Sequence, residues 1–303
     1  MKKLLIILPI VFASLYSMGQ QLPLYSQYLM NTYYINPAVA GSKEYAPIKL
    51  SVHKQWLGIK DSPSTQVVSG HMMLENDMVG LGAIIFNDNF GPTSHTGIQV
   101  SYAYHFYINR ENRIALGLSA LGFQYKMDQR FFTLTNPDDN SISYQIEKTF
   151  VPDANVGVYV YGPKYAAGIS AAHLFQSKLK INQNLDENIM VRHYFLFGSY
   201  RFEFRNTPLI DIEPSVLVKT IETITPQIDF NVKFFYDNDY WAAFSVRPND
   251  AFVAAIGLKI DNYYFGYAYD FTFSDLSSYT IGSQEIVLGI NVGERVRGGR
   301  SFF

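Results

Sequence analysis

Six histidines are the side chains of this sequence best suited to acid–base or metal chemistry. None belongs to a His-x-x-His or His-Glu-x-x-His motif, and no serine stands in a Gly-x-Ser-x-Gly motif. Isolated histidines of this kind are typical of a barrel lumen or a loop. We therefore expect no catalytic site, and we interpret the chain as a protein that is not an enzyme. The histidines are His53, His71, His95, His105, His173 and His193.

Two acidic clusters could supply oxygen ligands to calcium, one at Asp138-Asp139 and one at residues 237–239. The first falls in a long connection and the second in a tight turn, where aspartate and asparagine are favoured by the backbone. The sequence has no cysteine, which removes thiol chemistry, disulfides and a lipid anchor on cysteine. With a net charge of −2 and no basic patch, nucleic acid is not an expected partner either. We expect neither a metal nor a cofactor.

The first 19 residues have the pattern of an export signal. Lys2 and Lys3 form a basic start, residues 4–12 an apolar core, and Ser17 and Gly19 supply small side chains for cleavage after Gly19. The apolar core is shorter than the roughly 20 residues of a spanning helix. We predict that residues 20–47 follow as a periplasmic lead-in to the folded part.

Composition favours a membrane protein built from strands. Charged residues make up 17% of the chain, against roughly 25% in soluble domains. Aromatic residues make up 16%, with 23 Tyr, 23 Phe and 2 Trp, which suits rings at a membrane interface. Beyond the signal, no apolar run is long enough for a transmembrane helix. A secreted β-sandwich and a membrane β-barrel remain as the two candidate folds.

Apolar and polar residues alternate along most of the chain. In residues 98–106 isoleucine, valine, tyrosine and phenylalanine alternate with Gln99, Ser101, Ala103 and His105. Residues 228–234 and 285–292 repeat the pattern. A wall with one face toward lipid and the other toward a polar lumen produces this alternation.

The alternating runs predict about fourteen antiparallel strands, an even number as bacterial barrels usually have. We place them at 48–55, 65–73, 78–87, 96–107, 113–126, 153–161, 165–174, 192–204, 209–219, 225–236, 240–247, 251–260, 263–270 and 285–292.

The connections between these runs alternate in length. Every second one is a tight turn, such as residues 162–164 or 261–262, whereas most of the others are longer, notably 127–152 and 175–191. Outer-membrane barrels have short periplasmic turns and longer extracellular loops. The sequence therefore predicts an all-β transmembrane barrel over residues 48–292, with both mature termini in the periplasm and a C-terminal tail at 293–303.

Several segments resemble the PorP/SprF family of outer-membrane proteins from the type IX secretion and gliding machinery of the Bacteroidetes. The opening Gln21-Leu22-Pro23-Leu24-Tyr25-Ser26-Gln27-Tyr28 leads to Asn36-Pro37-Ala38-Val39-Ala40-Gly41-Ser42. Lys54-Gln55-Trp56-Leu57-Gly58 and Gly266-Tyr267-Ala268-Tyr269-Asp270 continue the match. At the last strand this chain reads Gly282-Ser283-Gln284-Glu285, where the family commonly has histidine in place of Gln284. The signature positions are Tyr25, Ser26, Gln27, Asn36, Pro37, Gly41, Gln55, Trp56, Tyr267, Tyr269 and Asp270.

The resemblance implies an integral protein of the cell outer membrane, in contact with its lipids. It also implies a role in the export or surface anchoring of large secreted proteins, including adhesins with a C-terminal sorting domain, together with other secretion and gliding components. The alternative is an outer-membrane channel or a transporter of hydrophobic solutes. A transporter would have a continuous polar lumen and conduct ions, whereas an anchor should be plugged and silent.

The mouth of the barrel is the expected place of contact with such a partner. Two connections that carry proline, at residues 61–64 and 87–92, are expected to be adjacent long loops there, with Trp56 beneath them. Preorganised loops lower the ordering cost of binding. The candidate partner-binding residues are Trp56, Asp61, Pro63, Asn87, Asp88, Gly91 and Pro92.

Overall fold

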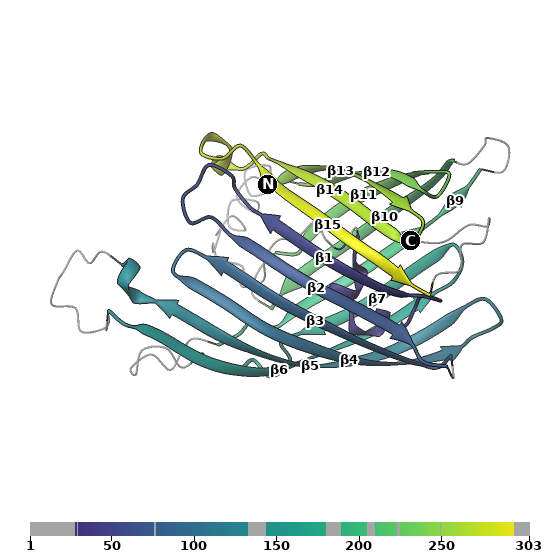
Figure 1. The fold of residues 1–303 in the computed structure, drawn as a ribbon, viewed down its shortest axis with the longest axis horizontal. Helices are drawn as coiled ribbons and strands as arrows, with labels where there is room; N and C mark the ends of the chain where they lie inside the picture. The colour runs from purple at the N-terminus through teal and green to yellow at the C-terminus, as the bar shows by residue number, and fades with distance from the viewer. Residues whose placement is uncertain are drawn as a thin grey trace, which may run out of the picture.

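The strands of this chain form one antiparallel sheet that closes on itself. The computed structural model describes residues 28, 30–75, 77–132, 144–179, 189–204, 210–222, 225–248 and 250–293. Strand β1 (Ala46–Lys54) pairs on one side with β2 (Ser64–Met73) and on the other with β15 (Ser283–Val292). Figure 1 shows the resulting barrel from the side, with its strands inclined to the long axis. The expected signal peptide and C-terminal tail lie outside the described residues, apart from Gly293.

The wall contains fourteen crossings, as predicted. Fifteen strands are labelled, but β8 and β9 are interrupted only at Arg201 and both pair with β10, so that they form one crossing. The remaining strands are β3 (Val79–Phe90), β4 (Thr93–Tyr107), β5 (Arg113–Asp128), β6 (Ile146–Tyr161), β7 (Tyr165–Ala172), β8 (His193–Tyr200), β9 (Phe202–Glu203), β10 (Ile210–Ile221), β11 (Gln227–Tyr236), β12 (Tyr240–Arg247), β13 (Ala251–Ile260) and β14 (Tyr263–Thr272).

Closing the sheet pairs backbone N–H and C=O groups that would otherwise lie at free edges in the lipid, which offers no hydrogen bonds. The seam between β1 and β15 runs in register from Ala46↔Val292 to Lys54↔Gln284. A closed barrel has no free edge across the hydrocarbon layer, which is why this topology can span a bilayer. The four 3₁₀ helices described are η2 (Thr32–Tyr34), η3 (Pro37–Val39), η4 (Gln129–Phe131) and η5 (Asp275–Ser278). Within the described part of the chain, no helix has the length and apolarity to cross a membrane.

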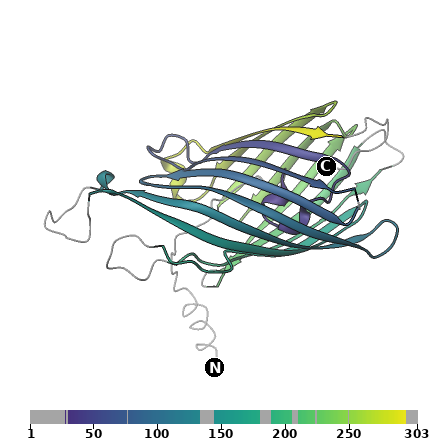
Figure 2. The ribbon, with the colours of Figure 1, turned by 60° about the horizontal axis from the view of Figure 1, so that its bottom comes forward.

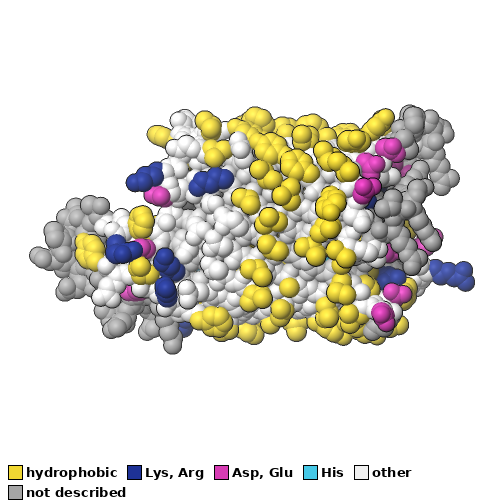
Figure 3. All heavy atoms as spheres, in the orientation of Figure 1, with side chains coloured by type: hydrophobic (Ala, Val, Ile, Leu, Met, Phe, Trp, Pro, Cys, Tyr) yellow, Lys and Arg dark blue, Asp and Glu magenta, His cyan; other side chains and the backbone are white. Residues whose placement is uncertain are grey.

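Along the strands, alternate side chains face the lipid and the lumen, as the alternation in the sequence predicts. Phe230 is 56% exposed on the outside, whereas its neighbour Asp229 is fully buried inside. Figure 3 shows the outer side chains as a hydrophobic band, with charged residues gathered at the two ends of the barrel. Exposed aromatic residues mark the end with the short turns, as expected of an interfacial girdle. They include Tyr107, Tyr200, Tyr236, Tyr240 and Tyr263.

At the opposite end of the barrel, the predicted strand boundaries at two connections were wrong. The connection expected to be a long loop around residues 87–92 is a two-residue turn, because β3 and β4 stay paired up to Phe90↔Thr93 and Gly91 supplies the positive φ of 55° that the turn needs. Strand β6 begins at Ile146 and not at 153, since it pairs with β5 up to Asp128↔Ile146. By the general rule for outer-membrane barrels, this end faces outward and the short turns face the periplasm.

Candidate functional site: the plugged lumen and the extracellular mouth

Residues 30–45 belong to the segment 20–47 that was expected to be a periplasmic lead-in, and they lie inside the barrel. Figures 1 and 2 show their short helices as a purple coil enclosed by the wall. Helix η3 contacts β4, β5 and β6, and Ala38 within it has no exposed surface. We call Tyr28 and residues 30–45 the plug.

Local chemistry explains why the plug folds there. Asn36 caps η3, because its side-chain oxygen accepts a hydrogen bond of 2.9 Å from the Ala38 N–H, and Pro37 starts the helix with a suitable φ. Tyr33, Ala38 and Val39 are buried and would otherwise face water. Burial of these apolar side chains therefore stabilises the segment inside the lumen, although its proline and glycine residues are typical of a surface turn.

Hydrogen bonds fasten the plug to strands on different sides of the lumen. The Tyr33 hydroxyl donates to Ser101 Oγ over 2.9 Å, and the Tyr28 hydroxyl donates to Asn231 Oδ1 over 2.8 Å. Asn36 Nδ2 donates to the Val158 carbonyl over 3.0 Å. Burial raises the pKa of Tyr33 to about 12, so the phenol stays protonated and able to donate.

The plug lies between two internal spaces. Tyr34 and Pro37 line a cavity of about 80 Å³ toward the extracellular end, together with apolar wall residues such as Phe123. Val39 and Gly41 line a space of about 1170 Å³ toward the short turns. We call the larger space the periplasmic vestibule.

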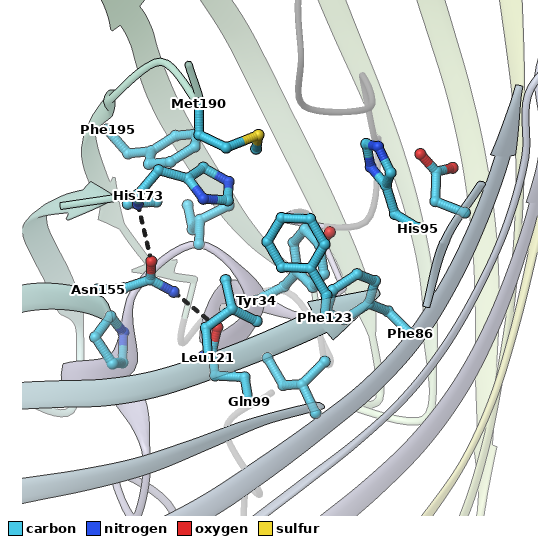
Figure 4. A pocket seen from close by; sticks show the side chains of 15 residues that line it. Tyr34, Phe86, His95, Gln99, Leu121, Phe123, Asn155, His173, Met190 and Phe195 are labelled. Atoms are coloured by element: carbon cyan, nitrogen blue, oxygen red, sulfur yellow. Dashed lines mark hydrogen bonds between the residues drawn. The ribbon is translucent and has the colours of Figure 1, made fainter. Parts of the chain in front are cut away.

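All six histidines are buried in the wall or beside the plug. His105 Nε2 lies 2.8 Å from the Ala40 carbonyl, and His71 Nδ1 accepts the Gly41 N–H over 3.1 Å. His173 Nδ1 lies 3.0 Å from Asp153 Oδ2, beside the cavity shown in Figure 4. Among the described residues no hydroxyl is hydrogen-bonded to the His173 ring, and no three His, Asp or Glu residues form a metal-binding group.

A buried ion pair stands beside the plug in the extracellular half. Arg247 Nε lies 3.2 Å from Asp229 Oδ1, and Arg247 Nη1 lies 3.0 Å from Asp250 Oδ2. Gln227 Nε2 also donates to Asp229 Oδ1 over 3.0 Å. These partners compensate charges that would be costly to bury alone.

Three connections meet at the extracellular end, and we call residues 55–63, 91–92 and 273–282 the extracellular mouth. The first and third are joined by backbone hydrogen bonds, from Leu57 N to the Gly282 carbonyl over 2.7 Å and from Ile281 N to the Leu57 carbonyl over 2.9 Å. The Gly91 N–H donates to the Asp61 carbonyl over 3.0 Å and joins the second connection to the first. The mouth is therefore a connected platform.

The structure brings together most of the residues predicted to bind a partner. Trp56 is half-buried in a left-handed conformation (φ 48°), and its backbone N–H donates to Ser283 Oγ over 3.1 Å. The Pro63 carbonyl accepts the Gln55 N–H over 2.9 Å. Asn87 and Asp88 differ from expectation, because both lie in β3: Asn87 bonds neighbouring polar side chains on the outer face, whereas Asp88 is buried in the lumen and accepts a hydrogen bond from Thr65.

The sequence analysis did not predict that the third connection of the mouth, residues 273–282, belongs to the candidate binding surface. Phe273, Tyr279 and Ile281 are 67%, 75% and 70% exposed there, more than most residues of the lipid-facing band. A cluster of apolar residues in a connection beyond the end of a strand is the signal in the sequence that could have indicated this binding surface.

A family model described as "Type IX secretion system membrane protein PorP/SprF" matches residues 17–290 of this chain. The chain belongs to the PorP/SprF family. It is accordingly an outer-membrane β-barrel of the type IX secretion system, and its family is one of secretion-system membrane proteins and not of enzymes. No curated protein matches it.

Solved structures resemble this PorP/SprF barrel in fold alone. The CymD monoaromatic hydrocarbon channel is 12% identical, with a TM-score of 0.49, over 90% of this chain and 94% of the other. A Pseudomonas aeruginosa FadL homologue is 11% identical, with a TM-score of 0.46, over the same 90% and 94%. The KdgM porin is 10% identical, with a TM-score of 0.38, over 82% of this chain and 99% of the other.

The signature positions of the PorP/SprF family fall into three places. Asn36, Pro37 and Gly41 belong to the plug, and Gln55 and Trp56 to the mouth. Three more lie on β14, where Tyr267 and Tyr269 are directed outward and Asp270 is buried inside. The Tyr269 hydroxyl donates to the Ile281 carbonyl and so supports the mouth. The remaining three, Tyr25, Ser26 and Gln27, lie outside the described residues.

Proposed function

We propose that this PorP/SprF barrel supports the export or cell-surface anchoring of large secreted proteins by binding them at its extracellular mouth. In this proposal the barrel binds the secreted protein and does not conduct it through the lumen. The partners are secreted type IX substrates with a C-terminal sorting domain, acting together with other secretion and gliding components.

The plug across the lumen is the observation that carries the proposal. The plug is hydrogen-bonded to β4 through Tyr33, to β6 through Asn36 and to β11 through Tyr28. A lumen crossed by a plug of the chain's own residues does not suit a conduit for a folded protein. It does suit a rigid base for a binding surface, since preorganisation lowers the entropy lost on association.

The chemistry of the mouth supports protein binding. Tyr279 and Ile281 present large exposed apolar surfaces on a platform whose backbone is fixed by interloop hydrogen bonds. Aromatic anchors surrounded by polar groups are typical of the energetic centre of protein interfaces. Trp56, Asp61, Pro63, Gly91 and Pro92 form the neighbouring part of the proposed surface, whereas Asn87 and Asp88 support it from β3.

Two matched double substitutions test this proposal. Tyr279→Ser with Ile281→Ser removes the exposed pair at the mouth (75% and 70%). Tyr240→Ser with Ile260→Ser removes a pair of the same residue types at the short-turn end that is somewhat less exposed (58% and 63%). Both variants should insert and keep their heat-modifiable mobility on gels. Only the mouth variant should release the secreted partner into the medium and lose it in co-purification. Equal retention by both variants would refute binding at the mouth.

The alternative function, a channel or a transporter of hydrophobic solutes, draws support from the apolar lining of the extracellular cavity. That cavity measures about 80 Å³, roughly half of a cavity of about 150 Å³ that holds benzene. A transporter also requires a continuous path past the plug. Planar-bilayer recordings distinguish the two, because an anchor should show no steady conductance whereas an open channel should.

A further inference from the structure

Strand β6 is much longer than the strand beside it. It pairs with β5 along its whole length, from Ile146 to Tyr161, but with β7 only between Val156 and Tyr161. Within the described part of the chain, residues 146–155 of β6 therefore have a strand partner on one side only. Figures 1 and 2 show the β5–β6 ribbon projecting past the ends of the neighbouring strands at the extracellular end.

The connection after β7 covers the nearer part of this edge. The Leu174 N–H donates to the Ala154 carbonyl over 3.0 Å, and Ser177 Oγ donates to the Pro152 carbonyl over 2.6 Å. Both carbonyls are thus directed away from β5. Because backbone direction alternates along a strand, the N–H and C=O groups of the even-numbered residues share this outward direction.

Beyond Pro152 the outward groups have no partner within the described ranges. These are the backbone N–H and C=O groups of Ile146, Lys148 and Phe150. Pro152 lies where the coverage by the connection after β7 ends, and proline is tolerated at an edge because it has no N–H to offer a neighbouring strand. An edge of this kind is complementary to the backbone of another strand.

Side chains of β5 and β6 indicate which residues a strand added to this edge should carry. Lys148 and Lys126 are directly opposite each other on the outer face, and like charges in this position repel. Phe150 is 70% exposed and lies over Gly122, where an added Cβ atom would be 2.9 Å from the Phe150 ring. An acidic residue next to the lysines and an apolar residue next to Phe150 would satisfy both features.

We propose that the outward edge of β6, formed by the backbone groups of Ile146, Lys148 and Phe150, binds an extended segment of the secreted partner by strand addition, with an acidic side chain beside Lys148 and Lys126. Backbone hydrogen bonds would supply the affinity and the lysines and Phe150 the selectivity, as in other cases of strand addition. This inference rests on the proposed function, because the partner is the secreted protein held at the mouth.

A pair of substitutions at one position tests the backbone contribution. Lys148→Pro removes an outward N–H and leaves the bonds to β5 in place, whereas Lys148→Gln removes only the charge. We expect Lys148→Pro to lower co-purification of the partner by about tenfold or more, and Lys148→Gln by about two- to fivefold. Heat-modifiability confirms insertion of both. Full retention by Lys148→Pro, with loss in the Tyr279→Ser, Ile281→Ser variant, would overturn strand addition and leave binding at the mouth intact.

Amide exchange of the unmodified barrel gives a second test that does not depend on a folded variant. In the barrel alone, the amides of Ile146, Lys148 and Phe150 should exchange much faster than those of Glu147, Thr149 and Val151, which are directed toward β5. In the co-purified complex the three fast amides should slow by about tenfold or more. Unchanged exchange of these three amides in the complex would overturn the inference. Retention of the partner by every variant, at the mouth and at Lys148, would instead refute the proposed function itself.

Discussion

Gly80 of β3 lies so close to Ala40 of the plug that a Cβ atom on Gly80 would stand 1.9 Å from the Ala40 carbonyl oxygen. Gly117 of β5 is in the same situation, with a distance of 2.2 Å from its added Cβ to the Ala38 N atom. The inward surface of these strands is therefore shaped to the backbone of the plug. Only glycine at these two positions allows so close an approach.

Gly80→Val should displace the plug, because a valine side chain cannot occupy space already filled by the Ala40 backbone. We expect planar-bilayer recordings of this variant to show a steady conductance, and recordings of the native barrel to show none. Gly198→Val on β8 is the matched control, since an added Cβ at Gly198 meets nothing within 4 Å. A Gly80→Val barrel that inserts normally and stays silent would contradict this account of the lumen.

Tyr33→Phe should make stability less sensitive to alkaline pH. The pKa of Tyr33 rises by burial from 10.0 to about 12, so the unfolded phenol loses its proton before the folded one. The stability that depends on the neutral phenol is complete below pH 10 and is lost as the pH rises to about 12, at about 1.4 kcal/mol per unit. Denaturant titrations at several pH values would measure this loss. An equal loss in Tyr33→Phe would show that other groups cause it.

Phe230→Arg should impair insertion or stability by ~2–4 kcal/mol, because Phe230 faces lipid. Asn231 on the opposite face is not a neutral control, since it accepts the Tyr28 hydrogen bond. Ser199→Arg is a better control, because Ser199 lines the large periplasmic vestibule. The free energies of unfolding in detergent or lipid would be compared. A larger cost for Ser199→Arg would invert the assignment of the faces.

Arg247→Leu should destabilise the barrel by about 3–5 kcal/mol, because it leaves Asp229 fully buried without its cation. The double variant Arg247→Leu, Asp229→Leu should recover a large part of that loss, since no buried charge of the pair then remains. Denaturation midpoints of the single and double variants would test this. Additive losses would show that the two side chains act independently.

The wall of the barrel was predictable from sequence because each of its residues obeys a short-range rule. Val100 and Tyr102 face lipid, whereas Gln99 and Ser101 face the lumen, as a strict period of two requires. The short turns were likewise recognisable, since residues such as Asp237 and Asn238 adopt the positive φ values of 53° and 59° that favour these residue types. The clustering of Asp61 with Gly91 at the mouth also followed from strand order.

The plug and the edge of β6 depended on contacts that no local pattern encodes. Asn36, Pro37 and Gly41 have the same turn chemistry in water as in a lumen, and glycines of the wall that are far away in sequence, in β3, β5 and β6, make room for them. Similarly, residues 146–152 read as part of a loop until pairing with β5 extends them into a strand. The sequence by itself determined a closed wall and its two faces, because backbone pairing and the hydrophobic effect act on alternating residues. The tertiary structure decided what fills the lumen and which edge stays free, because both depend on shape complementarity between segments remote in the chain.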